Sequence, residues 1–248
     1  MDWIYLSPHL DDAVLSCGGM IYAQVQAGER VEICTLFAGD PPGRRLPPFA
    51  RQLHQRWQTG PEAAAQRRAE DAAACAILGA SYRHLPYPDG IYRTLPGSGQ
   101  PLIRGEDDLF RSSLEREPQL RQQLTGWLAQ NLPAPARLVG PLAVGGHADH
   151  RLARAALEAL SRPLCYYPDY PYTRQPGWEP NDWIEPHWTR RTYALSPQAV
   201  QAWQQAVAAY ASQISTFWPS LDSMRAAIAA YAETGGGQSL WCRSQTHR

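Results

Sequence analysis

The stretch WIYLSPHLDDAVLSCGG (3–19) joins a short apolar run to a histidine, two adjacent aspartates and the start of a helical pattern. The run at 3–7 is typical of a buried strand. Apolar residues at helical spacing follow over 13–28, with a glycine at the end as a C-cap signal. A second apolar, β-branched strand is predicted over 31–39. Strand, helix and strand in this order form a βαβ unit, whose crossover is nearly always right-handed.

The same alternation continues to the end of the chain. Further helices are predicted over 61–80, 106–132 with an interruption near Pro118, 151–161, 196–214 and 221–233. Further strands are predicted over 81–87, over 136–144 and from 164, and the tail 235–248 adds a last strand or extended segment. We therefore expect an α/β fold: a single Rossmann-like domain over 1–248, with a mostly parallel sheet flanked by helices.

Three long connections, 40–60, 89–105 and 168–191, are expected to shape a pocket, since functional residues concentrate on such loops. The first is predicted to be a loop with at most one helical turn. The third is rich in aromatic residues and proline. Its aromatic side chains either offer stacking faces to a sugar or cover the core or an oligomer interface: Tyr166, Tyr167, Tyr170, Tyr172, Trp178, Trp183 and Trp188.

Composition excludes several classes of partner. The formal net charge is zero, which gives no electrostatic reason to expect nucleic acid or an anionic membrane surface. All 23 basic residues are arginine, which we interpret as codon bias. The N-terminus lacks the basic and apolar regions of a signal peptide, and no apolar run is long enough to cross a bilayer. The five cysteines are widely spaced and are expected to be free, mostly buried thiols of a cytoplasmic protein.

Two dense polar clusters follow predicted strands and precede predicted helices: His9-Leu10-Asp11-Asp12 and His147-Ala148-Asp149-His150. Ligands of open parallel sheets bind at the carboxyl ends of the strands, where such loops converge. Taken alone, an aspartate of the first cluster reads as a helix N-cap, and the second reads as a polar loop. Their shared position at one edge of the sheet favours a joint site.

The first cluster suits a catalytic metal. His9 and Asp12 lie three residues apart across a turn and can reach one ion, while Asp11 between them projects beside it. One imidazole of the second cluster would complete the three protein ligands that a catalytic zinc takes, and the other would remain free. A bound zinc lowers the pKa of its water ligand and polarises the carbonyl of the substrate. A nearby carboxylate can take the proton of that water, and an imidazole can stabilise the oxyanion that forms. These are the parts needed to hydrolyse an amide.

The motifs resemble those of a known family. SPHLDDAVLSCGG is similar to the H-P-D-D-E or H-x-D-D motif of the LmbE-like N-acetylglucosaminyl-phosphatidylinositol de-N-acetylases (PIG-L family), and GGHADHR to their H-x-D-H motif. RRAEDAAACAILGA resembles the R-x-x-E helix of that family. YYPDYPY and AAYASQISTFWPS resemble segments of a bacterial branch.

The resemblance implies a Rossmann-like fold, a divalent metal that is usually zinc, with iron(II) as the alternative in the cell, and removal of an N-acetyl or other N-acyl group from an amino sugar. Carried over by position, the metal ligands are His9, Asp12 and His150. Asp11 is the general base. His147 stabilises the tetrahedral intermediate and acts as general acid, oriented by Asp149. Arg67 and Asp89 match sugar contacts.

Two positions depart from the family pattern. Leu10 replaces the proline after the first histidine, and Ala13 replaces the glutamate after the aspartate pair. Neither change removes a ligand or the base. Loss of the glutamate puts in doubt the outer support that fixes the orientation of metal ligands.

Other functions remain open at this point. The chain is either a deacetylase, an amidase acting on a thiol-sugar conjugate or glycosylated natural product, or a non-catalytic sugar-binding relative. A nucleotide-binding module is disfavoured because SCGGM lacks the G-x-G-x-x-G pattern. The expected partner is a small N-acylated amino sugar or glycoconjugate, and assembly into a homo-oligomer stays open. The histidines without ligand-like neighbours are expected to have surface or structural roles: His54, His84, His187 and His247.

Overall fold

The computed structural model describes residues 2–43, 45–111, 116–174, 178–179 and 183–243. Its described strands form one seven-stranded sheet in the order β3-β2-β1-β4-β5-β7-β6. Five of them pair in parallel: β1 (Asp2–Ser7), β2 (Arg30–Thr35), β3 (Ser81–His84), β4 (Arg137–Pro141) and β5 (Leu164–Tyr167). Antiparallel pairing extends the β5 edge with β7 (Ser239–Arg243) and β6 (Thr189–Thr192). The expected α/β, mostly parallel fold is confirmed.

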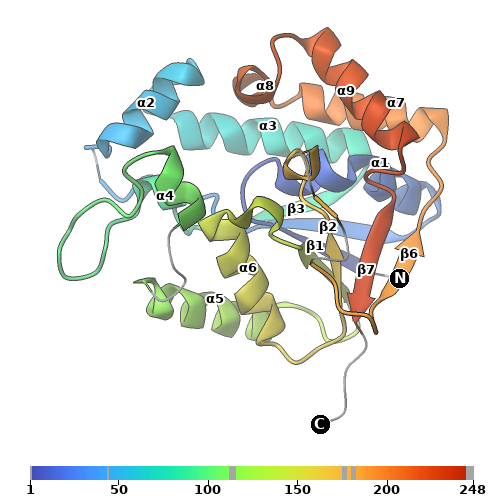
Figure 1. Cartoon of the computed structure of the whole chain (residues 1–248), viewed down its shortest axis with the longest axis horizontal. Coiled ribbons are helices and arrows are strands. Elements are labelled where there is room, and N and C mark those ends of the chain that lie inside the picture. The colour runs from blue at the N-terminus through green and yellow to red at the C-terminus, as the bar shows by residue number, and fades with distance from the viewer. Residues whose placement is uncertain (1, 44, 112–115, 175–177, 180–182, 244–248) are drawn as a thin grey trace.

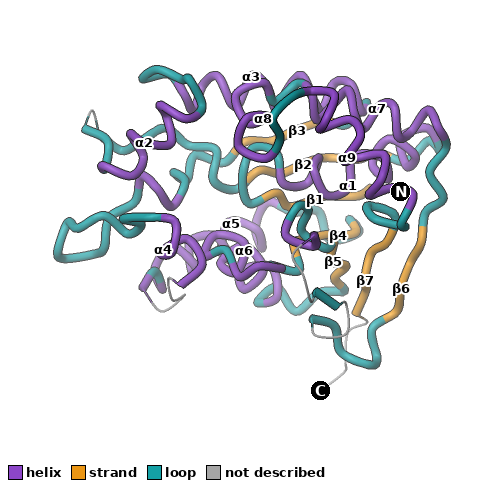
Figure 2. The backbone as a smooth tube through the Cα atoms, turned by 45° about the horizontal axis from the view of Figure 1, so that its top comes forward, coloured by secondary structure: helices purple, strands orange, loops and turns teal. Residues whose placement is uncertain are grey.

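Helices cover both faces of the sheet (Figures 1 and 2). One layer contains α1 (Asp12–Gln26), α3 (Ala63–Leu78), α7 (Pro197–Ala208) and α9 (Leu221–Glu233). The other contains α5 (Pro118–Asn131) and α6 (Ala148–Glu158). Three shorter helices are α2 (Pro48–Arg56), α4 (Glu106–Arg111) and α8 (Ala211–Phe217). Short 3-10 turns are η1 (Gly90–Tyr92), η3 (Val144–Gly146) and η4 (Tyr172–Arg174).

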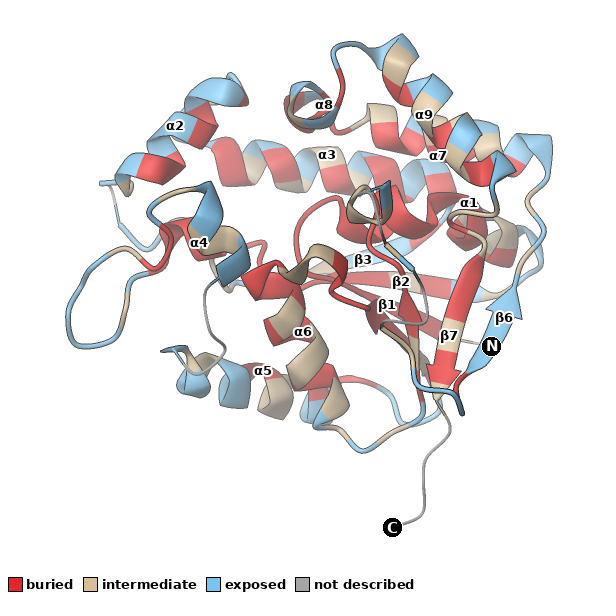
Figure 3. Ribbon diagram, viewed as in Figure 1, coloured by how far each residue is buried: buried red, intermediate tan, exposed pale blue. Residues whose placement is uncertain are grey.

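The central strands are buried on both faces, as Figure 3 shows for β1, β2 and β7. Apolar side chains therefore fill two cores, one on each face of the sheet. This explains why the strands appear in the sequence as continuous apolar runs rather than as alternating patterns.

Ser7, at the end of β1, caps helix α1. Its Oγ accepts a hydrogen bond from the backbone N–H of Ala13 at 3.0 Å and donates to the carbonyl of His9 at 2.6 Å. Asp11 occupies the N-cap position, but its side chain makes no capping bond. The Asp12 carboxylate accepts instead from the N–H of His9 at 2.8 Å. Asp11 is thus the N-cap residue by position, but Ser7 supplies the capping bond, which leaves both carboxylates available to the site.

Helix α7 packs closely on helix α1 because α1 carries two adjacent glycines there. Trp203 is fully buried, and its indole N–H donates to the carbonyl of Val14 at 2.7 Å. A Cβ on Gly18 would overlap the Trp203 ring, and one on Gly19 would crowd that ring and Leu195.

Two helix predictions need correction. The segment 40–60 contains α2, a nine-residue helix, rather than a single turn, because Pro48 starts it and Phe49 and Leu53 give it an apolar face. The predicted helix 196–214 is two helices, α7 and α8. They separate near Tyr210, whose buried hydroxyl donates to Asp71 Oδ1 at 2.6 Å. The interruption of 106–132 is confirmed, since α4 ends at Arg111 and α5 begins at Pro118.

The expectation of five free thiols is wrong for two of them. Cys165 on β5 and Cys242 on β7 are paired in register and form a disulfide, which joins positions 77 residues apart. The remaining cysteines are free and buried: Cys17, Cys34 and Cys75. Disulfides are uncommon in reducing compartments. The cytoplasmic location inferred from the cysteines therefore stays a prediction.

Within the described part of the chain, no helix combines the length and apolar character needed to cross a membrane.

We predict that Gly18→Ala lowers the free energy of unfolding by about 1–3 kcal/mol, because the added methyl overpacks the Trp203 contact. Gly126→Ala in α5 is the matched control. A Cβ there meets nothing within 4 Å, so the better helix former should add about 0.5–1 kcal/mol. Urea denaturation of both variants measures the difference. Equal effects would contradict the packing explanation.

Candidate active site

The two polar clusters meet where the strand order reverses. Chain crossovers run from β1 to β2 on one side and from β4 to β5 on the other, so the loops after β1 and β4 diverge and leave a crevice at their carboxyl ends. The β1 loop carries His9, Asp11 and Asp12 into the start of α1. The β4 loop carries His147 and His150 into the start of α6.

One carboxylate oxygen lies between two imidazoles. Asp12 Oδ2 is 3.1 Å from His9 Nδ1 and 3.2 Å from His150 Nε2. All three residues are buried. Ligand atoms about 2.0–2.1 Å from a tetrahedral zinc are separated from one another by about 3.3 Å, so these spacings fit a shared ion.

In each imidazole, the inner nitrogen faces Asp12 and the outer nitrogen points away from it. The outer nitrogen also contacts a carboxylate. His9 Nε2 lies 3.0 Å from Asp149, and His150 Nδ1 lies 2.7 Å from Asp169. Such partners hold the proton on the outer nitrogen and leave the lone pair of the inner nitrogen for a metal. The donor set, two oriented imidazoles and one carboxylate, therefore fits a catalytic divalent ion.

Charge pairing sets the protonation of this cluster. Burial alone would raise the pKa of the Asp12 carboxyl, but His150 and His9 hold that pKa well below its usual range. Burial likewise opposes ionisation of Asp149, and Arg93 and His9 lower its pKa well below the ordinary value. For His150, burial lowers the pKa, but Asp12 and Asp169 outweigh it and raise the pKa to about 9.

His147 lies beside the predicted ligands. Its ring centroid is 5.0 Å from those of both His9 and His150, and the three imidazoles bring ligand atoms within 4.8 Å of one another. A second such group is His9, Asp89 and Asp149. The structure thus brings all the predicted ligands together and adds neighbours able to ligate.

The predicted link between Asp149 and His147 is made by the backbone rather than by the carboxylate. The Asp149 N–H donates to His147 Nδ1 at 3.3 Å, so the neutral ring carries its proton on Nε2. The Asp149 carboxylate instead faces His9, the N–H of Gly90 at 3.0 Å and the guanidinium of Arg93. Its side chain therefore orients a predicted metal ligand and not the predicted acid.

Sequence reasoning missed three residues of this network: Asp169, Arg93 and Glu117. Arg93 is buried and bridges Asp149 to Glu117, with Nε 2.7 Å from Glu117 Oε1. Asp169 also accepts from the N–H of Val144 at 3.0 Å. The signal for Asp169 was present in YYPDYPY, an acidic residue directly after strand β5. No feature of the sequence around Arg93 indicated that this residue belongs to the network. Together they supply the outer support that the substitution at Ala13 put in doubt.

Asp11 and Asp89 flank the guanidinium of Arg67. Arg67 Nη2 is 3.7 Å from Asp11, and Nη1 is 3.8 Å from Asp89, both too long for direct hydrogen bonds. Arg67 Nε is buried with no partner among the described residues, and the guanidinium lies 5.0 Å from the Trp57 ring centroid. Burial raises the pKa of Asp11 to about 7 against the opposing pull of Arg67.

These side chains open into a cavity of about 290 Å³. Its floor is polar, and the rest of its lining combines apolar and aromatic side chains with the exposed ion pair of Arg56 and Glu106. The predicted site residues that line it are His9, Asp11, Asp12, Arg67, Asp89 and His147. Asp149 and His150 lie behind this floor, each 1% exposed.

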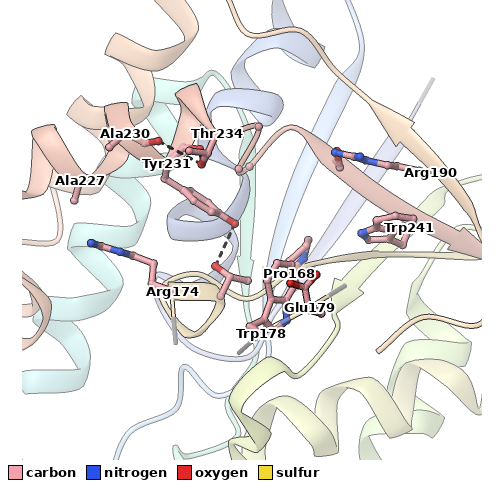
Figure 4. A pocket seen from close by; sticks show the side chains of 15 residues that line it. Pro168, Arg174, Trp178, Glu179, Arg190, Ala227, Ala230, Tyr231, Thr234 and Trp241 are labelled. Carbon is pink, nitrogen blue, oxygen red and sulfur yellow. Dashed lines mark hydrogen bonds between the residues drawn. The ribbon is translucent and has the colours of Figure 1, made fainter. Parts of the chain in front are cut away.

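The aromatic loop divides between several places. Tyr166, Tyr167, Tyr170 and Trp188 are buried, so packing accounts for them. Tyr172 lines the active-site cavity. Trp178 lines a separate cavity of about 650 Å³ between η4 and the C-terminal end of α9, with Tyr231 and Trp241 (Figure 4). None of the predicted site residues lies there.

The remaining histidines have the structural or surface roles expected of them where they are described. His54 bonds the Tyr92 hydroxyl at 2.7 Å, His84 contacts Asp71 at 2.8 Å, and His187 is exposed beside Glu185. His247 lies outside the described residues.

A mostly parallel α/β sheet with a His/Asp cluster at its switch point is the arrangement typical of ligand and active sites in α/β proteins. The family model described as PIG-L, GlcNAc-PI de-N-acetylase, matches residues 4–161. The chain belongs to this family.

Relatives of the chain are deacetylases by name. It is 30% identical over 213 residues, 75% of this chain and 71% of the relative, to 2'-N-acetylparomamine deacetylase of Niallia circulans. A structure of the zinc-inhibited form of teicoplanin deacetylase Orf2 is 28% identical with a TM-score of 0.77, covering 100% and 99% of the two chains. The A40926 pseudoaglycone deacetylase Dbv21 is 28% identical with a TM-score of 0.69, covering 99% and 98%. The expected enzyme class, an N-deacetylase, is confirmed.

We predict that Arg93→Met lowers the free energy of unfolding by about 3–5 kcal/mol, because it removes the cation that pairs with the buried Asp149 carboxylate and with Glu117. Arg30→Met is the control. Arg30 pairs with Asp2 at the surface, where its side chain is 84% exposed, and its loss should leave the urea midpoint unchanged. Equal midpoints for the two variants would show that the Arg93 pairs carry little stability.

Proposed function

We propose that this chain is a divalent-metal-dependent hydrolase that removes an acyl group, acetyl in the first instance, from the amino group of a sugar in a glycoconjugate. The single observation that carries this proposal is the position of Asp12 Oδ2 between the inner nitrogens of His9 and His150. The membership of the chain in a de-N-acetylase family supports it.

In this proposal His9, Asp12 and His150 hold the metal, which we take to be zinc, with iron(II) as the alternative. Bound there, the ion would supply Lewis-acid polarisation of the amide carbonyl and lower the pKa of water. Asp149 and Asp169 keep the two imidazoles in the tautomers that leave their inner nitrogens free.

Asp11 is the base. Its carboxylate lines the cavity next to Asp12, with Arg67 as its nearest cation at 3.7 Å. It takes a proton from the attacking water as the new C–O bond forms. It returns that proton to the nitrogen as the C–N bond breaks, which yields one amine and one carboxylic acid. The Asp11 carboxyl group therefore accepts one proton and gives it back, and it ends the reaction in the protonation state in which it began.

His147 stabilises the charge that develops on the carbonyl oxygen. Because Nδ1 accepts from the backbone N–H of Asp149, the neutral ring has Nε2–H as its donor. A donor fixed by the start of α6 needs no reorganisation when the oxygen becomes negative. In this proposal Asp11, and not the neutral His147, protonates the leaving amine, and the general-acid role that the family pattern gives to His147 stays an untested prediction.

Arg67 and Asp89 are the proposed contacts to sugar hydroxyls. The terminal nitrogens of Arg67 stand back from both neighbouring carboxylates, at 3.7 Å from Asp11 and 3.8 Å from Asp89. Arg67 and Asp89 both line the cavity, so these nitrogens can donate to a ligand there and Asp89 offers an acceptor. The relatives are named for deacetylation of 2'-N-acetylparomamine, teicoplanin and the A40926 pseudoaglycone, which supports an N-acylated glycoconjugate as substrate.

We predict that Asp11→Asn lowers the rate of acetate release about 10²–10⁴-fold while the variant still binds metal, because the amide cannot take the proton. Acetate release from an N-acetylglucosaminide and metal content by elemental analysis are measured together. Asp222→Asn, 93% exposed on α9, is the control and should retain full rate. Full activity of the Asp11 variant would overturn its assignment as base.

We predict that His150→Ala abolishes metal binding, whereas Asp169→Asn weakens it about 10–100-fold, because Asp169 only orients His150. Competition with a chelator measures the dissociation constant for Zn²⁺ in both variants. Wild-type affinity in His150→Ala would contradict the ligand set. If Asp169→Asn kept the wild-type dissociation constant for Zn²⁺ while His150→Ala lost the metal, only the orienting role of Asp169 would be contradicted.

A further inference from the structure

A second pocket with charged walls lies at the edge of the sheet opposite the active site. It has a volume of about 290 Å³ and is lined by the amino ends of β4, β5 and β6 and by the carboxyl end of β7. Strand β4 shows the separation, because it begins at Arg137 in this pocket and ends at Pro141, before His147 of the active site. Five residues at about 3.3 Å each place roughly 13–16 Å between the two edges.

Positive charge is concentrated in this second pocket. Its lining includes four arginines from separate parts of the chain: Arg137 on β4, Arg162 in the turn between α6 and β5, Arg191 on β6 and Arg243 on β7. The described lining residues include no aspartate or glutamate. The whole chain, by contrast, carries 23 basic and 23 acidic residues. The pocket is therefore a local excess of positive charge in a formally neutral chain.

Two of these guanidinium groups have no carboxylate partner among the residues that the structure describes. Arg137 is half-buried, and its guanidinium carbon lies 4.9 Å from the Trp3 ring centroid. Arg191 is exposed on β6, and its side chain makes no ion pair with a described residue. An aromatic face holds a cation in place without neutralising its charge. Arg137 and Arg191 can therefore donate to an anion in the pocket.

The other two arginines add charge that their neighbours compensate only in part. Arg243 Nη1 lies 3.9 Å from Glu158, too far for a hydrogen bond, and that carboxylate already accepts from Arg154 at 3.0 Å. Arg162 donates to backbone carbonyls between residues 132 and 136. These neutral acceptors fix its guanidinium but leave its charge. Both groups therefore contribute positive potential to the pocket.

The backbone that carries these arginines is fixed before any ligand binds. The Cys165–Cys242 disulfide forms part of the pocket wall and joins β5 to β7. The alternation of side chains along β6 places Thr189 and Arg191 in the pocket, whereas Arg190 lines the separate cavity of Figure 4. A site held by paired strands and a covalent link needs little rearrangement to bind a ligand, which lowers the cost of binding.

We propose that this pocket binds a phosphate group, either as the free ion or on a small phosphorylated molecule, with Arg137 and Arg191 as its donors. The planar guanidinium matches two phosphate oxygens, and a phosphate monoester is close to a dianion at pH 7. Like charges gathered in one pocket repel one another, and a dianion offsets this repulsion better than a carboxylate does. The volume, near the lower end of the usual roughly 300–1,000 Å³, suits a small ligand. The inference does not depend on the proposed deacetylase function.

Isothermal titration of the metal-loaded protein with inorganic phosphate and with glycerol 3-phosphate, at constant ionic strength, tests this proposal. We expect saturable binding of one equivalent. Arg137→Gln and Arg191→Gln should each weaken it about 10-fold or more, since each removes a charge-assisted hydrogen bond. Arg190→Gln is the matched control, because it removes the same charge from the same strand on the other face. It should change the dissociation constant less than about 2-fold, since salt screens distant charges. Thermal denaturation checks that each variant is folded.

The two ligands distinguish the source of the phosphate. Tighter binding of glycerol 3-phosphate supports a phosphorylated molecule, and tighter binding of inorganic phosphate supports the free ion. Binding that Arg137→Gln and Arg191→Gln leave unchanged would place the anion elsewhere, as at the active-site metal, and would overturn the inference. Equal weakening by Arg190→Gln and Arg191→Gln, acetate binding as tight as that of phosphate, or no saturable binding would also overturn it. So would binding to phosphatidylglycerol vesicles but to neither phosphate compound, which would indicate a membrane-facing surface.

Discussion

The site depends on one carboxylate oxygen shared by two imidazoles from distant parts of the chain. Asp12 Oδ2 lies within 3.2 Å of both His9 and His150. This contact exists only because β1 and β4 are neighbours in the sheet, although more than a hundred residues separate them in sequence. Three ionisable groups buried so closely require compensation. The outer nitrogens of the two imidazoles obtain it from Asp149 and Asp169, and their inner nitrogens flank Asp12 Oδ2.

The compensation extends well beyond the three residues. A line of alternating charge runs from Glu117 through Arg93 and Asp149 to His9, and Asp169 holds the other imidazole. A buried network of this kind is costly when one member is removed, which makes it a rigid support for a reaction centre. In the proposed function this network takes the place of the family glutamate after the aspartate pair, because it orients His9 and His150.

The cavity lining beyond the predicted site residues is formed largely by the peripheral helices. Related catalytic floors can accept different substrates, and the peripheral helices decide which larger group fits above them. Here α2, α4 and α8 present aromatic side chains around a charge-neutral rim.

The sequence by itself determined the α/β class, the two β-to-α turns and the cluster of ionisable groups, because periodicity and strand-end polarity are local properties. The polar clusters and the interruption before Pro118 could be predicted in this way. Only the tertiary structure decided that Asp149 supports His9 rather than His147, that Asp169 supports His150, and that Cys165 pairs with Cys242. Those contacts join residues far apart in the chain, and their partners are set by strand order and register, which leave no signature in any short stretch of residues.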